Sequence, residues 1–166
     1  MNEKIGSAEQ RPLQAALYAA LPVAAAAVLG NMATIPNIPV WYASLIKPSF
    51  NPPNWIFGPV WTILFFMMAY AFYRILRMPA QSAGRTSSIG LFLVQMALNA
   101  LWSWAFFAAQ SPLAGLVVIV LLWVMIAASS ISFAQLDRVA AVLMFPYLLW
   151  VSFALVLNTA IFRLNP

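Results

Sequence analysis

The side chains that usually carry enzyme chemistry are almost missing from this sequence. It contains no histidine and no cysteine, and its three acidic residues are Glu3, Glu9 and Asp137. Paired carboxylates, Ser/His/Asp arrangements, Cys or His nucleophiles and metal-ligand clusters are therefore excluded. We expect no catalytic residues, no metal site and no cofactor. Proton-coupled transport is also disfavoured, since no acidic residue or histidine falls within an apolar run.

The remaining candidates for binding chemistry are aromatic and amide side chains at helical spacing. Residues three or four positions apart lie on one face of a helix. Three such stripes occur: Trp61, Phe65, Met68 and Phe72; Gln95, Asn99, Trp102, Ser103 and Phe106; and Trp150, Ala154 and Asn158. A buried amide costs free energy unless it is paired, so we expect these faces to point into the protein rather than toward lipid.

Two interpretations of the stripes remain open. The amides could be hydrogen bonds between helices, worth about 0.6 kcal/mol each in membrane bundles, with the tryptophans as interface anchors. Alternatively, the stripes could wall a cavity with a few polar donors, which suits a flat, largely apolar ligand. Trp61, Trp102 and Trp150 fall well inside their predicted spans rather than at the ends. Their depth favours the cavity.

The composition predicts an all-α integral membrane protein. Of 166 residues, 64% are hydrophobic and only 7% are charged, whereas soluble proteins average about 25% charged residues. The apolar runs are continuous rather than alternating, which favours helices over a β-barrel. The net charge of +5 comes from cations at the ends of these runs. Such placement is typical of membrane topology and argues against nucleic-acid binding.

The order of apolar runs predicts a single five-transmembrane-helix bundle. Ser111 suits an N-cap and Pro112 the first helical position, and together they divide a long uncharged stretch. After a polar tail at 1–11, we expect one membrane domain at 12–166 with helices at about 13–35, 54–77, 88–108, 112–134 and 139–162. A cleaved signal peptide is the alternative for the first run. The two acids before it and Pro22 within it argue against cleavage.

The distribution of cations predicts the orientation. The N-terminal side carries Lys4, Arg11, Arg74, Arg77, Arg85 and Arg138, whereas the other side carries Lys47 and Arg163. Since cytoplasmic loops are enriched in Lys and Arg, we expect a cytoplasmic N-terminus and an external loop at 36–53.

That external loop is rich in proline and aromatic residues. Proline lacks a backbone N–H and has a fixed φ, so Pro36 to Pro53 cannot form a continuous helix. We expect an ordered loop at the membrane surface, held in shape by Lys47, Pro48, Pro52 and Pro53.

Several motifs together resemble a known family. They are Trp41-Tyr42, Lys47-Pro48, Asn51-Pro52-Pro53, Pro59-Val60-Trp61, Gln95, Leu98-Asn99, Trp102-Ser103, Phe106-Phe107, Pro146-Tyr147, Leu149-Trp150, Phe153-Ala154 and Leu157-Asn158. On these residues the chain resembles the tryptophan-rich sensory protein / translocator protein (TspO/MBR) family, also called the peripheral benzodiazepine receptor family, in a bacterial form. The resemblance covers about residues 13–162.

This resemblance implies a five-helix bundle, usually a homodimer, with a pocket beneath the loop between the first two helices. Its ligands would be porphyrins such as protoporphyrin IX, sterols, and isoquinoline or benzodiazepine drugs, bound for sensing, regulation or transport. Trp41 and Tyr42 would belong to the lid. The walls would use Trp61, Phe65, Asn99, Trp102, Trp150 and Ala154, and the stripes add Phe106 and Asn158 as ligand-binding candidates.

The chain departs from the family at the cholesterol motif of animal members, which needs a tyrosine before the basic residue. Val156 to Arg163 offers Phe162 but no tyrosine. A loose match at Leu64, Tyr70 and Arg74 is weak evidence. A porphyrin role in a bacterial membrane therefore fits better than cholesterol binding. The alternatives are light-dependent porphyrin degradation and a structural or transport subunit without its own chemistry.

Overall fold

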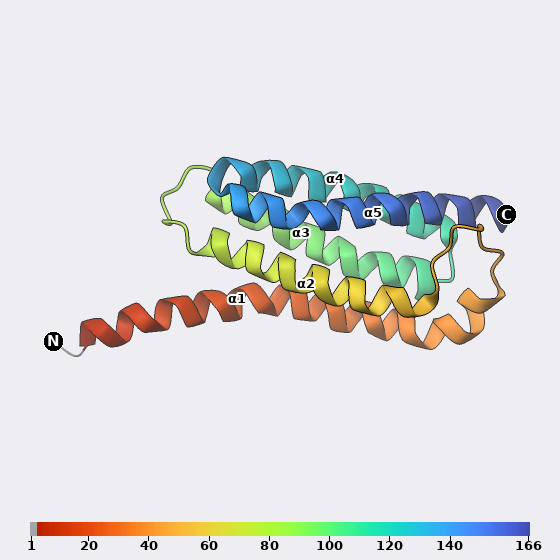
Figure 1. Cartoon of the computed structure of the whole chain (residues 1–166), viewed down its shortest axis with the longest axis horizontal. Helices are drawn as coiled ribbons and strands as arrows, with labels where there is room; N and C mark the ends of the chain where they lie inside the picture. Colours follow the sequence, from red (N-terminus) through yellow and green to blue (C-terminus); the bar gives the residue numbers. More distant parts are fainter. Residues whose placement is uncertain (1–2) are drawn as a thin grey trace.

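The fold is a bundle of five long helices, seen in a computed structural model that describes the backbone of residues 3–166 and side chains from Pro12 onward. The helices are α1 (Glu3–Thr34), α2 (Asn54–Leu76), α3 (Arg85–Ser103), α4 (Pro112–Leu136) and α5 (Arg138–Leu164). They run side by side, and the loop after α1 meets the C-terminus at one end (Figure 1). Five helices of the described chain are long and apolar enough to cross a membrane. The predicted all-α membrane bundle is confirmed.

Aromatic and small side chains fill the interior in different places. Phe92 of α3 stacks on Phe72 of α2 with ring centroids 4.1 Å apart, and on Phe133 of α4 at 6.0 Å. On α1, alanines cover the inward face, and a Cβ added to Gly30 would lie 3.2 Å from the Ser103 hydroxyl. Close contact of this kind drives helix association in a bilayer, where lipid tails are as apolar as the interior.

The helix ends follow local capping chemistry. The Ser111 hydroxyl accepts a hydrogen bond from the Ala114 backbone N–H at 3.2 Å, and Pro112 occupies the first helical position, as predicted. Helix α3 begins at Arg85, earlier than predicted. The Arg85 guanidinium donates to the Ile75 and Leu76 carbonyls at the end of α2. This contact explains why a charged residue starts α3.

The first helix is longer at both ends than the sequence predicts. Residues 3–11, expected as a tail, are helical, whereas Met1, Asn2 and the side chains of 3–11 lie outside the description. After Thr34 the chain continues as a 3-10 helix at Ile35–Asn37 and a π-helix at Ile38–Tyr42. The predicted loop at 36–53 is therefore shorter.

Two prolines fit this continuation because the hydrogen-bond pattern changes where they occur. Pro36 lies in the 3-10 segment and Pro39 in the π segment. The Asn37 side-chain amide donates to the Ala33 carbonyl at 2.8 Å. A side chain thus replaces a backbone donor in the turn where Pro36 has none.

At the end of the bundle away from the loop after α1, an ion pair joins α2 to the start of α5. Arg74 Nε lies 2.8 Å from Asp137 Oδ2, and the other carboxylate oxygen caps α5 by accepting from the Val139 and Ala140 N–H groups. Burial alone raises the pKa of Asp137, but hydrogen bonds from Arg74, Ala140 and Val139 outweigh it and lower the pKa below its ordinary value.

Acidification should therefore weaken the fold through Asp137. A carboxyl group whose folded pKa is lowered stabilises the protein above its unfolded pKa of about 3.9 and loses that contribution as the pH falls through the folded value. We expect the thermal midpoint in detergent to drop between pH 5 and pH 2. In Asp137→Asn, which can still cap the helix but does not titrate, the drop should be smaller. Equal drops would exclude Asp137 as the cause.

Candidate functional site

An aromatic cluster lies where the end of the first helix meets the end of the third. The π-helix Ile38–Tyr42 faces a second π-helix, Trp104–Ala108. Trp41 contacts Phe106 edge-on at 5.2 Å, and Trp102 stacks on Phe106 at 5.5 Å and 18°. Tyr42 is 5% exposed and packs on Phe107 at 5.7 Å. π-Helical turns are rare in proteins, and those that occur are often at functional sites. Two of them facing each other therefore make this region a candidate functional site.

The loop above the cluster is tied down by polar contacts. The Tyr42 hydroxyl donates to Asn51 Oδ1 at 2.8 Å. The Lys47 ammonium donates to two loop carbonyls, of Ala43 and Leu45, and lies 4.9 Å from the Tyr42 ring centroid. Asn165, beyond α5, pairs with both the N–H and the carbonyl of Ile46 at 3.0 Å. Lys47 is thus hydrogen-bonded within the loop, and Asn165 joins the loop to the C-terminus.

A second group of aromatic residues joins α2 to α5. Trp61 lies 5.3 Å from Phe65 on its own helix and 6.1 Å from Tyr147 on α5. Trp150 contacts Phe57 edge-on at 5.8 Å. Ala154, also predicted, packs half-buried against the same core. The predicted wall residues are thus brought together, but they lie in two connected groups.

Two of the three predicted amides, Asn99 and Asn158, bind partners on other helices. Asn99 donates to the Tyr147 hydroxyl at 2.8 Å. Asn158 accepts from the Trp102 indole N–H at 3.2 Å and donates to the Pro112 carbonyl at 2.8 Å. Hydrogen-bonding between helices and lining an aromatic region are therefore not exclusive roles, because Asn99 and Asn158 do both.

Sequence reasoning did not assign Tyr147 to the site, although it contacts both Trp61 and Asn99. A signal was available: Tyr147 precedes Trp150 by one helical turn, on the face that carries the α5 stripe. Phe57 and Phe107 were not assigned either. Their roles depend on neighbours from distant segments, which periodicity along one helix does not reveal.

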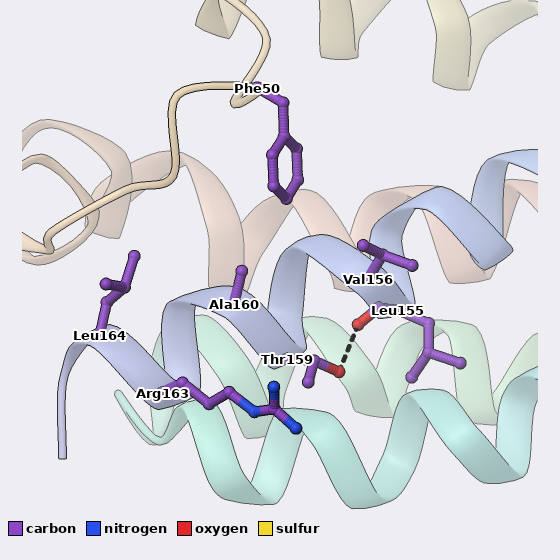
Figure 2. Close-up of a pocket in the computed structure, with 7 residues that line it drawn as sticks. All are labelled: Phe50, Leu155, Val156, Thr159, Ala160, Arg163 and Leu164. Carbon is purple, nitrogen blue, oxygen red and sulfur yellow. Dashed lines mark hydrogen bonds between the residues drawn. The ribbon is translucent and has the colours of Figure 1, made fainter.

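Two open grooves lie beside α5. One groove, of about 380 Å³, lies on the surface between α2 and α5 and is lined by Trp150 and Phe153 together with other apolar residues. The other, of about 460 Å³, follows the last turns of α5. Figure 2 shows Phe50 of the loop pointing toward this helix, with Arg163 near its end. Trp150 therefore links the aromatic region to a groove that opens outward.

The sequence is similar to those of known proteins. The sequence model described as the TspO/MBR family matches residues 18–164. The chain is 49% identical over 126 residues to the "Tryptophan-rich protein TspO" of Chlorobaculum tepidum, covering 76% of this chain and 80% of that protein. It is 39% identical over 145 residues to the protein of the same name in Archaeoglobus fulgidus, with coverages of 87% and 93%. It is 37% identical over 129 residues to the Homo sapiens "Translocator protein", covering 75% of each. The chain is a multi-pass membrane protein that belongs to the TspO/MBR family.

Proposed function

We propose that the protein is a membrane receptor for a flat, largely apolar ligand of the tetrapyrrole class, such as protoporphyrin IX. The observation that carries the proposal is that Trp61, Trp102 and Trp150 pack against one hydrophobic core near an anchored loop. Two amides are hydrogen-bonded within the same region, Asn158 to Trp102 and Asn99 to Tyr147. Relatives named "Tryptophan-rich sensory protein" and "Translocator protein" support a receptor role rather than an enzymatic one.

The chemistry of the region suits such a ligand. Indole and phenyl faces stack on a conjugated ring, each aromatic pair contributing about 0.5–1.5 kcal/mol beyond its buried area. Because these side chains pack on one another, a ligand would replace aromatic contacts within the protein by contacts with its own ring. The loop, fixed by Asn165 and Tyr42, is already ordered, which lowers the entropy cost of closing over the ligand.

Orientation and assembly are further parts of the proposal. Arg74, Arg77, Arg85 and Arg138 lie at one end of the bundle and Lys47 and Arg163 at the other, which favours a cytoplasmic N-terminus and an external loop. The family resemblance implies a homodimer, which mass measurement in lipid nanodiscs would test. Four further points stay predictions: transport of the ligand, its light-dependent degradation, sterol binding, and location in a bacterial membrane.

The test is titration with protoporphyrin IX in nanodiscs, followed by the porphyrin's own absorbance. Replacing Trp102 and Trp150 together by alanine should raise the Kd by about 10- to 100-fold, because two stacking contacts are lost. The matched control is Trp55→Ala, since Trp55 is 73% exposed and its loss should leave the Kd within about twofold. An unchanged Kd in the double variant would refute the site.

A further inference from the structure

One fully buried amide side chain, that of Gln95, takes part in none of the hydrogen bonds described above. Gln95 of α3 is 0% exposed, and neither its Nε2 nor its Oε1 has a hydrogen-bond partner among the described residues. The Ser129 hydroxyl of α4 is likewise fully buried and unpartnered within that part of the chain. Buried polar atoms are nearly always paired, so three such atoms call for an explanation.

The helix register places Gln95 and Ser129 in neighbouring layers. Helices α3 and α4 are antiparallel, and the Ser88 and Ser132 hydroxyls, 2.6 Å apart, fix their alignment. Ser129 is one turn from Ser132 and Gln95 two turns from Ser88, both toward the loop end. Side chains on a helix lean toward its N-terminus, so the Gln95 amide is directed toward the level of Ser129.

Gln95 also lies next to the candidate ligand site, on the side away from the loop. The same buried face of α3 carries Asn99 one turn closer to the loop and Trp102 beyond it. Asn99 and Asn158 already have protein partners, so their capacity to bind a ligand is partly used. Gln95 retains a free donor and a free acceptor at the deep end of this face.

We propose that Gln95, assisted by Ser129, selects ligands bearing a neutral group that both donates and accepts a hydrogen bond, such as a lactam or amide. This inference rests on the proposed tetrapyrrole site and narrows its ligand class. A lactam N–C=O pairs with a primary amide through one N–H···O bond in each direction. Among tetrapyrroles, linear ones carry terminal lactams, whereas the edge of a protoporphyrin ring opposite its carboxylates is apolar.

A carboxylate does not suit this position. Residues 86–136 contain no charged side chain. The one cation of α3 and α4 is Arg85, at the start of α3, and it is already bound to the Ile75 and Leu76 carbonyls. An ionised carboxylate buried without a partner is strongly disfavoured. The carboxylates of either ligand should therefore remain toward the loop end, where Lys47 and Arg163 lie.

The experiment compares two probes, biliverdin and protoporphyrin IX, in nanodiscs. Gln95→Met keeps the length of the side chain and removes its hydrogen bonds. We expect it to weaken biliverdin binding about tenfold, because both hydrogen bonds to the lactam are lost and each is modest in net strength. The affinity for protoporphyrin IX should stay within twofold. Ser130→Ala is the matched control, because that neighbouring hydroxyl already donates to the Ile126 carbonyl; both affinities should be unchanged.

The outcomes separate the inference from the function on which it rests. Unchanged biliverdin affinity in Gln95→Met, an equal loss for both probes, or no biliverdin binding by the wild type would each overturn the selection by Gln95. If neither probe binds the wild type, the proposed function fails as well. Should Gln95→Met not fold, Ser129→Ala decides: a severalfold loss for biliverdin alone supports the inference, and no loss overturns it.

Discussion

Replacing Phe92 by alanine is expected to lower the free energy of unfolding by about 3 kcal/mol, the lower end of the range for Phe-to-Ala changes in protein cores. Phe92 is 0% exposed and stacks on both Phe72 and Phe133. It therefore joins α2, α3 and α4 through one side chain. In a bilayer the loss comes from packing contacts rather than from transfer to water.

Reversible unfolding in mixed micelles would measure this effect, with Phe66→Ala as the control. Phe66 is 73% exposed on the same α2 that carries Phe72, so its removal should cost less than about 0.5 kcal/mol. Phe92 lies far from the loop end, so we expect the folded variant to bind protoporphyrin IX as the wild type does. A cost for Phe92→Ala no greater than that of Phe66→Ala would contradict the packing described.

Gly115→Ala should have the second large effect, by about 2 kcal/mol, because it overpacks the junction of α4 with the third helix. A Cβ at this position would lie 2.7 Å from Phe106 Cδ2, 2.9 Å from Phe106 Cβ and 3.0 Å from Asn158 Oδ1. The added methyl group must displace Phe106, on which Trp102 stacks, and Asn158, to which Trp102 donates. Ligand affinity should therefore fall together with stability.

Gly90→Ala supplies the matched control for Gly115→Ala. Apart from its chain neighbours and the backbone of its own helix, nothing lies within 4 Å of a Cβ at Gly90, which is an exposed position inside α3. Alanine is favoured over glycine in a helix by about 0.5–1 kcal/mol, so this variant should be slightly more stable. A Gly115→Ala protein that is also more stable, with unchanged affinity, would show that Phe106 and Asn158 can move aside at no cost.

Much of the fold follows from local signals in the sequence. Charge-free apolar runs mark the helices, and Ser111 with Pro112 fixes the start of α4, since the capping hydroxyl and the missing N–H act within one turn. The end of the first helix was predicted too early. Pro36 and Pro39 exclude a regular α-helix, but they do not exclude the 3-10 and π turns that carry the chain to Tyr42.

The candidate site was only partly predictable for a related reason. Spacing identifies which residues share a helix face, so Asn99, Trp102 and Asn158 could be singled out. Their partners come from other helices: Tyr147 for Asn99, and the Pro112 carbonyl for Asn158. Spacing along one helix carries no information about such pairs. The unpartnered state of Gln95 likewise emerges only when all neighbouring helices are in place.

The most direct test of the account is an experimental structure of the protein in lipid with protoporphyrin IX bound. We predict a ring in contact with Trp61, Trp102 and Trp150, beneath the loop that Asn165 and Tyr42 hold. A ring lying instead in the groove of about 460 Å³ along α5, beside Phe50 and Arg163, would contradict it.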